Sequence, residues 1–172
     1  MAKISIQEAD FDPGAEIASL GPGAGGIGCF IGIVRGDAGG REITAMTLEH
    51  YPGMTERAVR AIAEEAEKRW NLSAVTVIHR VGRLAPGENI VLVLAAAPHR
   101  DPALAATRFL IDWLKTEAPF WKKEHFADGA EAWVEAQEAD TEATARWRAG
   151  GLCPPAPPAR AWGPGPRSLG GG

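Results

Sequence analysis

The sequence predicts a single domain of the α+β class, because it combines helical and strand periodicities with a hairpin turn. Residues 53–70 carry apolar side chains at three- and four-residue spacing, which is typical of an amphipathic helix. Residues 3–7 alternate apolar and polar side chains, as an edge strand does. Between two apolar segments, Ala85-Pro-Gly-Glu88 fits a type II turn. Since 45% of the 172 residues are hydrophobic, one core suffices for folding without disulfides.

The first half of the chain is predicted to alternate short regular elements with loops. Asp12 and Pro13 are the residue types preferred at the N-cap and the first position of a helix. Glycines dominate residues 21–28 and 36–40, which predicts two loops. The elements in order are an edge strand at 3–7, a short helix at 13–20, strands at 28–35 and 42–51, and the long helix at 53–70.

The second half is predicted to contain the hairpin and a second long helix. The apolar run at 90–97 indicates a central strand that is covered on both faces. Asp101 is the expected N-cap of the next helix, Pro102 its first residue, and Pro119 marks its end. The elements in order are strands at 74–84 and 88–97, a helix from 101 towards 119, and extended segments at 120–126 and 131–136.

Residues 150–172 differ in composition from the rest of the chain. Thirteen of these 23 residues are glycine or proline. Such a segment buries too little apolar surface to offset the entropy lost on ordering. We therefore predict one domain over residues 1–149 and a disordered Pro/Gly-rich tail over residues 150–172.

Charge and composition exclude several classes of function. The formal net charge of -4 argues against a nucleic-acid partner bound by bulk positive charge. Cys29, Cys153 and the four scattered histidines show no metal-ligand spacing, and this usage is typical of a reduced, cytoplasmic protein. No apolar run reaches about 18 residues, so no membrane span is predicted. The glycine motif in residues 21–28 precedes a predicted strand and not a helix, which argues against a dinucleotide site.

Lysines and large aromatic residues cluster at residues 113–125. Burial of the aromatic rings would bring Lys115, Lys122 and Lys123 next to apolar surface. Positive charge there costs desolvation energy unless an anion balances it, and neighbouring cations lower one another's pKa. Because the chain can fold back at Pro119 and bring Lys115 and Lys122 together, we predict an anion pocket with a lysine whose lowered pKa suits acid–base chemistry or nucleophilic attack. The alternative is three solvated lysines whose stems cover the aromatic rings.

Two further basic segments are candidates for anion binding. His99 and Arg100 lie between a buried strand and the start of a helix, where free N–H groups favour anions. The guanidinium of Arg100 also suits phosphate, although it could instead pair with Asp101 in a surface loop. Arg35 ends an apolar strand, and on its own this position indicates only a solvated strand end.

Five segments, in order along the chain, carry a resemblance to a known family. They are Leu48-Glu-His-Tyr-Pro-Gly-Met-Thr55, Val75-Thr-Val-Ile-His-Arg-Val-Gly82, His99-Arg100, Leu114-Lys-Thr-Glu-Ala-Pro-Phe-Trp-Lys122 and Trp133-Val-Glu-Ala136. On these motifs the chain resembles the large, catalytic subunit of molybdopterin synthase from about residue 3 to residue 148.

The resemblance implies a fold, partners and a reaction. The fold is an α/β hammerhead with an additional antiparallel β-subdomain. The assembly is a homodimer with a small ubiquitin-like sulfur-carrier subunit at each end, whose C-terminal Gly-Gly thiocarboxylate enters the large subunit's pocket. Sulfur passes to cyclic pyranopterin monophosphate and forms the dithiolene of molybdopterin. The enzyme itself uses no metal and no cofactor.

The resemblance also implies roles for individual residues. Lys115 and Lys122 match the catalytic lysines of the family, and Lys115, which has cationic neighbours and aromatic cover, is the expected proton-transfer residue. Arg35, His99 and Arg100 match residues that bind substrate, in a pocket to which both protomers contribute.

Two positions depart from the family pattern. Gln137 stands where an arginine is common, and Ile33 where a lysine is common, so both departures remove positive charge. Lys123, Arg41 and Arg146 are candidates to compensate, and we include Lys123 among the expected substrate-binding residues.

Two other functions compete with the enzyme on sequence alone. A non-catalytic adaptor would bind the Gly-Gly tail of a ubiquitin-like protein without turnover. A stand-alone anion-binding protein would bind a soluble phosphate compound and no protein partner. The presence of both Lys115 and Lys122 favours the enzyme.

Overall fold

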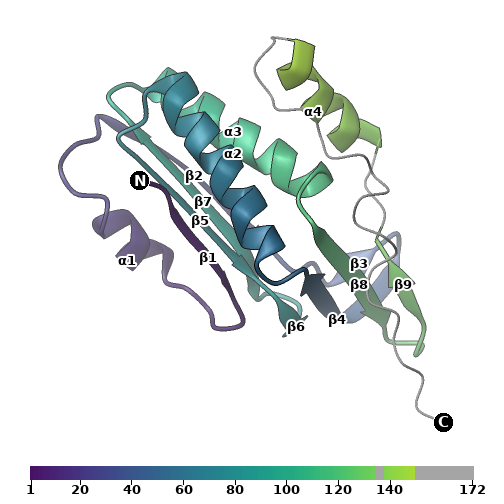
Figure 1. Ribbon diagram of the computed structural model, residues 1–172. Coiled ribbons are helices and arrows are strands. Elements are labelled where there is room, and N and C mark those ends of the chain that lie inside the picture. The colour runs from purple at the N-terminus through teal and green to yellow at the C-terminus, as the bar shows by residue number, and fades with distance from the viewer. Residues whose placement is uncertain (135–137, 150–172) are drawn as a thin grey trace.

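The computed structural model describes residues 1–134 and 138–149 and consists of two sheets with helices packed on the larger one. The larger sheet has the strand order β1-β5-β7-β2 (Figure 1), and β1 is parallel to β5 while the other pairs are antiparallel. Its strands are β1 (Lys3–Gln7), β5 (Ala74–Arg80), β7 (Asn89–Ala97) and β2 (Gly26–Ile33). The predicted edge strand and the predicted central strand are therefore both confirmed.

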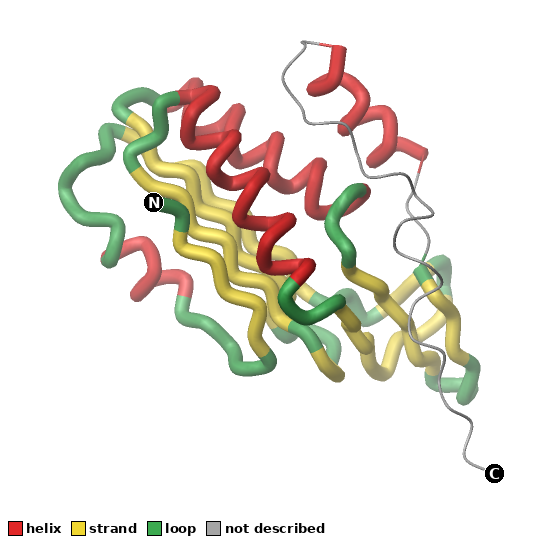
Figure 2. The backbone as a smooth tube through the Cα atoms, in the orientation of Figure 1, coloured by secondary structure: helices red, strands yellow, loops and turns green. Residues whose placement is uncertain are grey.

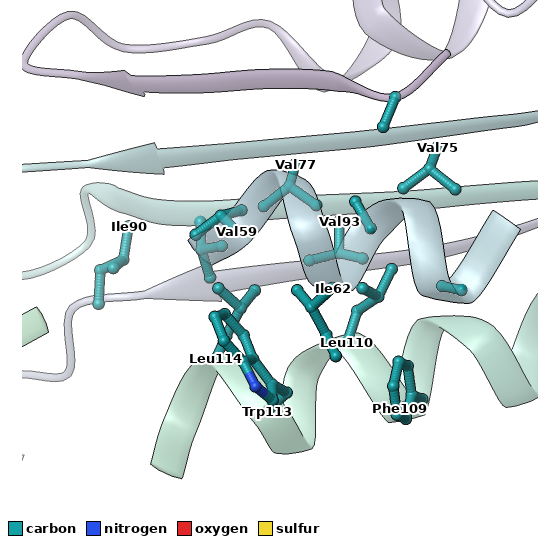
Figure 3. Packing of buried hydrophobic residues seen from close by; sticks show 14 of the residues in the cluster. Val59, Ile62, Val75, Val77, Ile90, Val93, Phe109, Leu110, Trp113 and Leu114 are labelled. Atoms are coloured by element: carbon teal, nitrogen blue, oxygen red, sulfur yellow. The ribbon is translucent and has the colours of Figure 1, made fainter. Parts of the chain in front are cut away.

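Two long helices, α2 (Met54–Trp70) and α3 (Arg100–Thr116), lie side by side across one face of this sheet (Figure 2). Their apolar stripes meet the side chains that alternate strands present to that face. Figure 3 shows Val77 and Val93 of the sheet next to Ile62 and Leu110 of the helices, and all four side chains are at most 1% exposed. This interface is the main core, and it determines the position in space of the C-terminal end of α3.

The opposite face of the sheet is covered by the segment around α1 (Pro13–Ala18). Asp12 caps α1 by accepting hydrogen bonds from the backbone N–H groups of Gly14 and Ala15, as predicted. Phe11 packs there against Ile78 of β5 and two leucines of β7. Strand β7 is thus buried on both faces, which explains its continuous apolar run.

The second sheet projects from one end of the first and is antiparallel (Figure 1). Its strands are β3 (Asp37–Ala38), β4 (Arg41–His50), β8 (Phe120–Phe126), β9 (Glu131–Trp133) and β6 (Gly82–Leu84). The long strand β4 pairs with β3, β6 and β8, so it organises this subdomain. The architecture confirms the predicted α+β class with an additional antiparallel β-subdomain.

Three sequence expectations about the elements are wrong in detail. The helix α3 begins at Arg100 with His99 as its N-cap and without a side-chain cap, so Asp101 lies in the first turn instead of capping it. The single strand expected at 74–84 is interrupted: Gly82 has φ 86, and β6 leaves the first sheet to pair with β4. The expected loop at 36–40 contains β3, which forms a tight hairpin with β4.

The helix α4 (Glu138–Ala149) is absent from the sequence prediction, because it has no continuous apolar stripe. It docks on α3 mainly through Trp147, whose ring meets those of Trp70 and Phe109 edge-on. Its indole Nε1 donates to Asp112 Oδ2 at 2.7 Å. Tertiary contacts, of which those of Trp147 are the largest, therefore determine where this helix lies.

Gln137 and the predicted tail at 150–172 lie outside the described residues. Within the described ranges, no helix is both long enough and apolar enough to cross a bilayer.

Candidate active site

A cavity of about 560 Å³ opens where the two sheets meet, beside the C-terminal end of α3. Its apolar lining includes Phe30, Met46, Val91, Leu114 and Phe120. Its charged and titratable lining comprises Arg35, His79, Lys115, Lys122, Glu124 and Asp140. Three of the six basic residues expected at the site therefore meet in one hollow.

The link between α3 and β8 brings Lys115 and Lys122 to the same cavity. Lys115 lies in the last turn of α3, and Lys122 is the third residue of β8. The reversal between them is tight, since the N–H of Ala118 donates to the Trp113 carbonyl at 3.2 Å. The fold-back that the sequence suggested at Pro119 is confirmed.

The two lysines have different surroundings. Lys122 is partly buried, and burial lowers its pKa, Lys115 lowers it further, and Asp140 opposes both effects. The Lys115 side chain is about half exposed, and its Nζ lies 3.3 Å from Asp140 Oδ1. Lys122 is therefore the lysine whose burial favours the neutral amine. The sequence had instead indicated Lys115 as the proton-transfer residue.

Lys123 faces away from the cavity. Successive strand residues point to opposite faces, so Lys123 projects to the outer side of the subdomain. There its Nζ lies 3.2 Å from Glu131 Oε2 and 4.9 Å from the centroid of the Trp133 ring. Within one chain, the expected substrate-binding role of Lys123 has no geometric support.

His99 and Arg100 lie at the other end of α3. Fifteen residues of helix separate Arg100 from Lys115, which corresponds to about 23 Å. Both residues are exposed, and Arg100 Nε lies 3.6 Å from Asp101 Oδ1. A single chain therefore does not bring His99 and Arg100 to the cavity that holds Lys115.

His79 is a lining residue that sequence reasoning did not identify as part of the site. Its ring stacks on Phe120 with 3.8 Å between centroids and 14° between planes. Nδ1 lies 2.8 Å from the Arg80 carbonyl, and because a carbonyl only accepts, Nδ1 carries the proton. Burial, with a smaller contribution from Lys122, lowers the pKa of His79 to about 3. The ring is thus a neutral wall of the cavity, and only its place in the alternation of β5 could have indicated this.

Because His79 is buried in its neutral form, stability should depend on pH. The unfolded chain takes up this proton near pH 6.5 and the folded chain only near pH 3, so the stabilisation is present above pH 6.5 and is lost as the pH falls. We expect His79 to account for a loss of about 2 kcal/mol of unfolding free energy between pH 7 and pH 5. Urea titrations at both pH values would measure it.

The comparison sets the wild type against a variant that lacks the ring. The His79→Gln variant should show a flatter pH dependence of stability than the wild type, whatever its absolute stability. An equal pH dependence in the two proteins would show that folding does not shift the pKa of His79.

The described residues contain no group of three or more His, Cys, Asp or Glu side chains arranged to hold a metal ion. The chemistry available from the described lining is that of ammonium and guanidinium groups, two carboxylates and a neutral imidazole in a partly apolar hollow. Such a lining can bind an anion and move a proton.

Comparison with known proteins identifies the family. The family model described as MoaE protein matches residues 6–117. The molybdopterin synthase catalytic subunit of Mesorhizobium japonicum is 52% identical over 149 residues, which cover 84% of this chain and 92% of the relative. That of Escherichia coli K12 is 50% identical over 123 residues, covering 72% of this chain and 81% of the relative.

Solved structures agree in fold. The molybdopterin biosynthesis MoaE protein from Burkholderia ambifaria MC40-6 has a TM-score of 0.73 at 51% identity, covering 86% of this chain and 99% of that one. Molybdopterin synthase from Staphylococcus aureus has a TM-score of 0.69 at 26% identity, covering 77% and 96%. Since both the family model and close relatives match most of its length, the chain belongs to the MoaE protein family, the family of molybdopterin synthase catalytic subunits.

Proposed function

We propose that this chain is the sulfur-transferring subunit of a molybdopterin synthase. It takes sulfur from the thiocarboxylated Gly-Gly terminus of a small ubiquitin-like subunit and delivers it to cyclic pyranopterin monophosphate, which forms the molybdopterin dithiolene. The observation that carries the proposal is the convergence of Arg35, Lys115 and Lys122 on one cavity, in a chain about half identical to curated catalytic subunits.

The cavity suits a flat, anionic heterocycle. Its volume of about 560 Å³ lies within the range of small-ligand sites. Phe30 and Phe120 offer apolar walls for a ring, and three cations from three separate segments of the chain offer partners for phosphate and carboxyl-terminal oxygens. Size, wall chemistry and charge are consistent with one substrate class.

The cations have distinct roles in this proposal. Sulfur attack and opening of the cyclic phosphate both develop negative charge, which preorganised cations stabilise where water is partly excluded. Lys122, whose pKa burial lowers, is the proton-transfer residue, because a neutral amine is available to it closer to neutral pH. Lys115 and Arg35 hold the anionic oxygens of the substrate and of the partner's terminus.

We further propose a homodimer in which His99 and Arg100 of one protomer complete the partner's pocket. Both residues are exposed, and about 23 Å of helix separates Arg100 from Lys115 of the same chain. In a two-fold dimer, a residue at one end of an element can approach the opposite end of the same element in the partner. The composite pocket would restore part of the positive charge that Ile33 and Gln137 remove.

The direct test is reconstitution. The purified protein is mixed with a thiocarboxylated ubiquitin-like donor and cyclic pyranopterin monophosphate, and dithiolene formation is measured. We expect product only when all three are present. Tight binding of the donor tail with no product would instead indicate the adaptor.

Mixing of inactive variants tests the composite pocket. Lys115→Ala and Arg100→Ala should each lose most activity as homodimers. After subunit exchange, about a quarter of the pockets should be intact, and that fraction of activity should return. The same assay measures the recovery.

The control mixes Lys115→Ala with Arg35→Ala. Both residues line the cavity of a single chain, so every pocket in the mixed dimer carries one substitution and no activity should return. Absence of recovery in the Arg100 mixture as well would place the whole site within one protomer.

A further inference from the structure

The first turns of α4 bring a carboxylate to the cavity that the family comparison does not explain. Asp140 lines the cavity, and its Oδ1 lies 3.3 Å from Lys115 Nζ. The Lys115 side chain is 46% exposed and that of Asp140 28%, so this ion pair stands at the mouth and not in the core. An anion that enters the cavity must compete with Asp140 for Lys115.

The position of α4 does not depend on Asp140. Further along the helix, Trp147 Nε1 donates to Asp112 Oδ2 at 2.7 Å, and Thr144 Oγ1 donates to the Asp112 carbonyl at 3.0 Å. Arg148 pairs with Glu117. These contacts hold α4 against α3 without Asp140. The helix therefore positions the Asp140 carboxylate at the mouth of the cavity, and loss of that carboxylate should not displace the helix.

The pKa of Lys122 depends on Asp140 as well as on the other charged groups of the cavity. The titratable and charged groups that line the cavity with Lys122 are Arg35 after β2, His79 on β5, Lys115 on α3, Glu124 on β8 and Asp140 on α4. Outside the lining, the charge of His50 on β4 also acts on His79. His79 is neutral, and Asp140 raises the pKa of Lys122 against burial and Lys115.

We propose that Asp140 is a positioning residue: an internal counter-ion that holds Lys115 at the mouth of the empty pocket and yields it to the anionic group of an incoming ligand. A ligand that brings its own negative charge replaces Asp140, whereas a neutral ligand leaves the pair closed. Asp140 thereby weakens the binding of anionic ligands by the strength of one partly exposed ion pair. The inference rests on the proposed function only in that the pocket receives an anion.

The first test needs no ligand. Trace acetylation as a function of pH gives the pKa of Lys122 in the folded protein. In Asp140→Asn this pKa should fall, because the carboxylate that opposes the effects of burial and Lys115 is removed. It should stay at the wild-type value in Asp140→Glu and in Glu142→Gln, which removes an exposed carboxylate outside the cavity lining on the same helix. An unchanged pKa in Asp140→Asn would overturn the proposal.

The second test uses inorganic phosphate as the probe and protection of Lys115 from acetylation as the readout. Phosphate should protect Lys115 at about threefold lower concentration in Asp140→Asn than in the wild type. Equal concentrations in the two proteins would overturn the role of Asp140 and leave the anion site intact. Absence of protection in both would contradict the proposed function, and the Lys122 titration would then decide on Asp140 alone.

Discussion

Replacement of Lys122 by methionine should reduce dithiolene formation by about 10²–10⁴-fold, the usual contribution of a positioned proton-transfer group. Methionine keeps the length and the apolar stem of the side chain, so β8 should pair with β4 as before. The loss should appear in kcat more than in KM, because the amine acts as charge develops in the transition state. Steady-state assays of the reconstituted enzyme would measure both constants.

The neighbouring lysine supplies the control for this experiment. Lys123→Met removes the same ammonium group one residue along the strand, where Nζ meets Glu131 on the outer face. Its kcat should stay close to the wild-type value. Near-normal turnover in Lys122→Met, or an equal loss in both variants, would contradict the assignment of Lys122.

The Phe109→Ala variant should lose about 3–5 kcal/mol of unfolding free energy. The Phe109 side chain is 1% exposed, and its ring lies 5.1 Å from that of Trp70 and 5.5 Å from that of Trp147, between centroids. Truncation leaves a cavity where α2, α3 and α4 meet, and these rigid helices cannot collapse into it. Urea unfolding followed by tryptophan fluorescence and by circular dichroism would give the difference.

Leu104 on the same helix provides the comparison. It is 59% exposed, so Leu104→Ala should change the unfolding free energy by no more than about 0.5 kcal/mol. A loss of similar size in the two variants would mean that helix propensity, and not the aromatic contact, determines the stability of this region.

The elements that depend on local signals were predictable from the sequence. The helix α2 has its apolar stripe, α1 has its Asp-Pro start, and the turn after β6 has Gly87 at φ 88, as a type II turn requires. That Lys115 and Lys122 line the same cavity was also predictable, because only a short link around Pro119 separates the two lysines.

Features set by distant contacts were not predictable. The strand expected at 74–84 divides because β4 offers a partner to β6, and nothing near Gly82 in the sequence reports this. Trp147 seats α4 by contacts with α2 and α3, so neither the helix nor the Asp140–Lys115 pair could be anticipated. The difference in burial between Lys115 and Lys122 likewise arises only after both sheets assemble.

The opposite orientations of Lys122 and Lys123 have a consequence for how mutation can damage the protein. If β8 slipped by one residue along β4, the two ammonium groups would exchange sides, because the side-chain period of a strand is two. An insertion of one residue between Glu117 and Phe120 that shifts β8 in this way puts Trp121 in the place of Lys122, while the backbone hydrogen bonds between β8 and β4 re-form. Such an insertion therefore spares the fold and removes the buried ammonium group from the cavity, whereas a deletion puts Lys123 there.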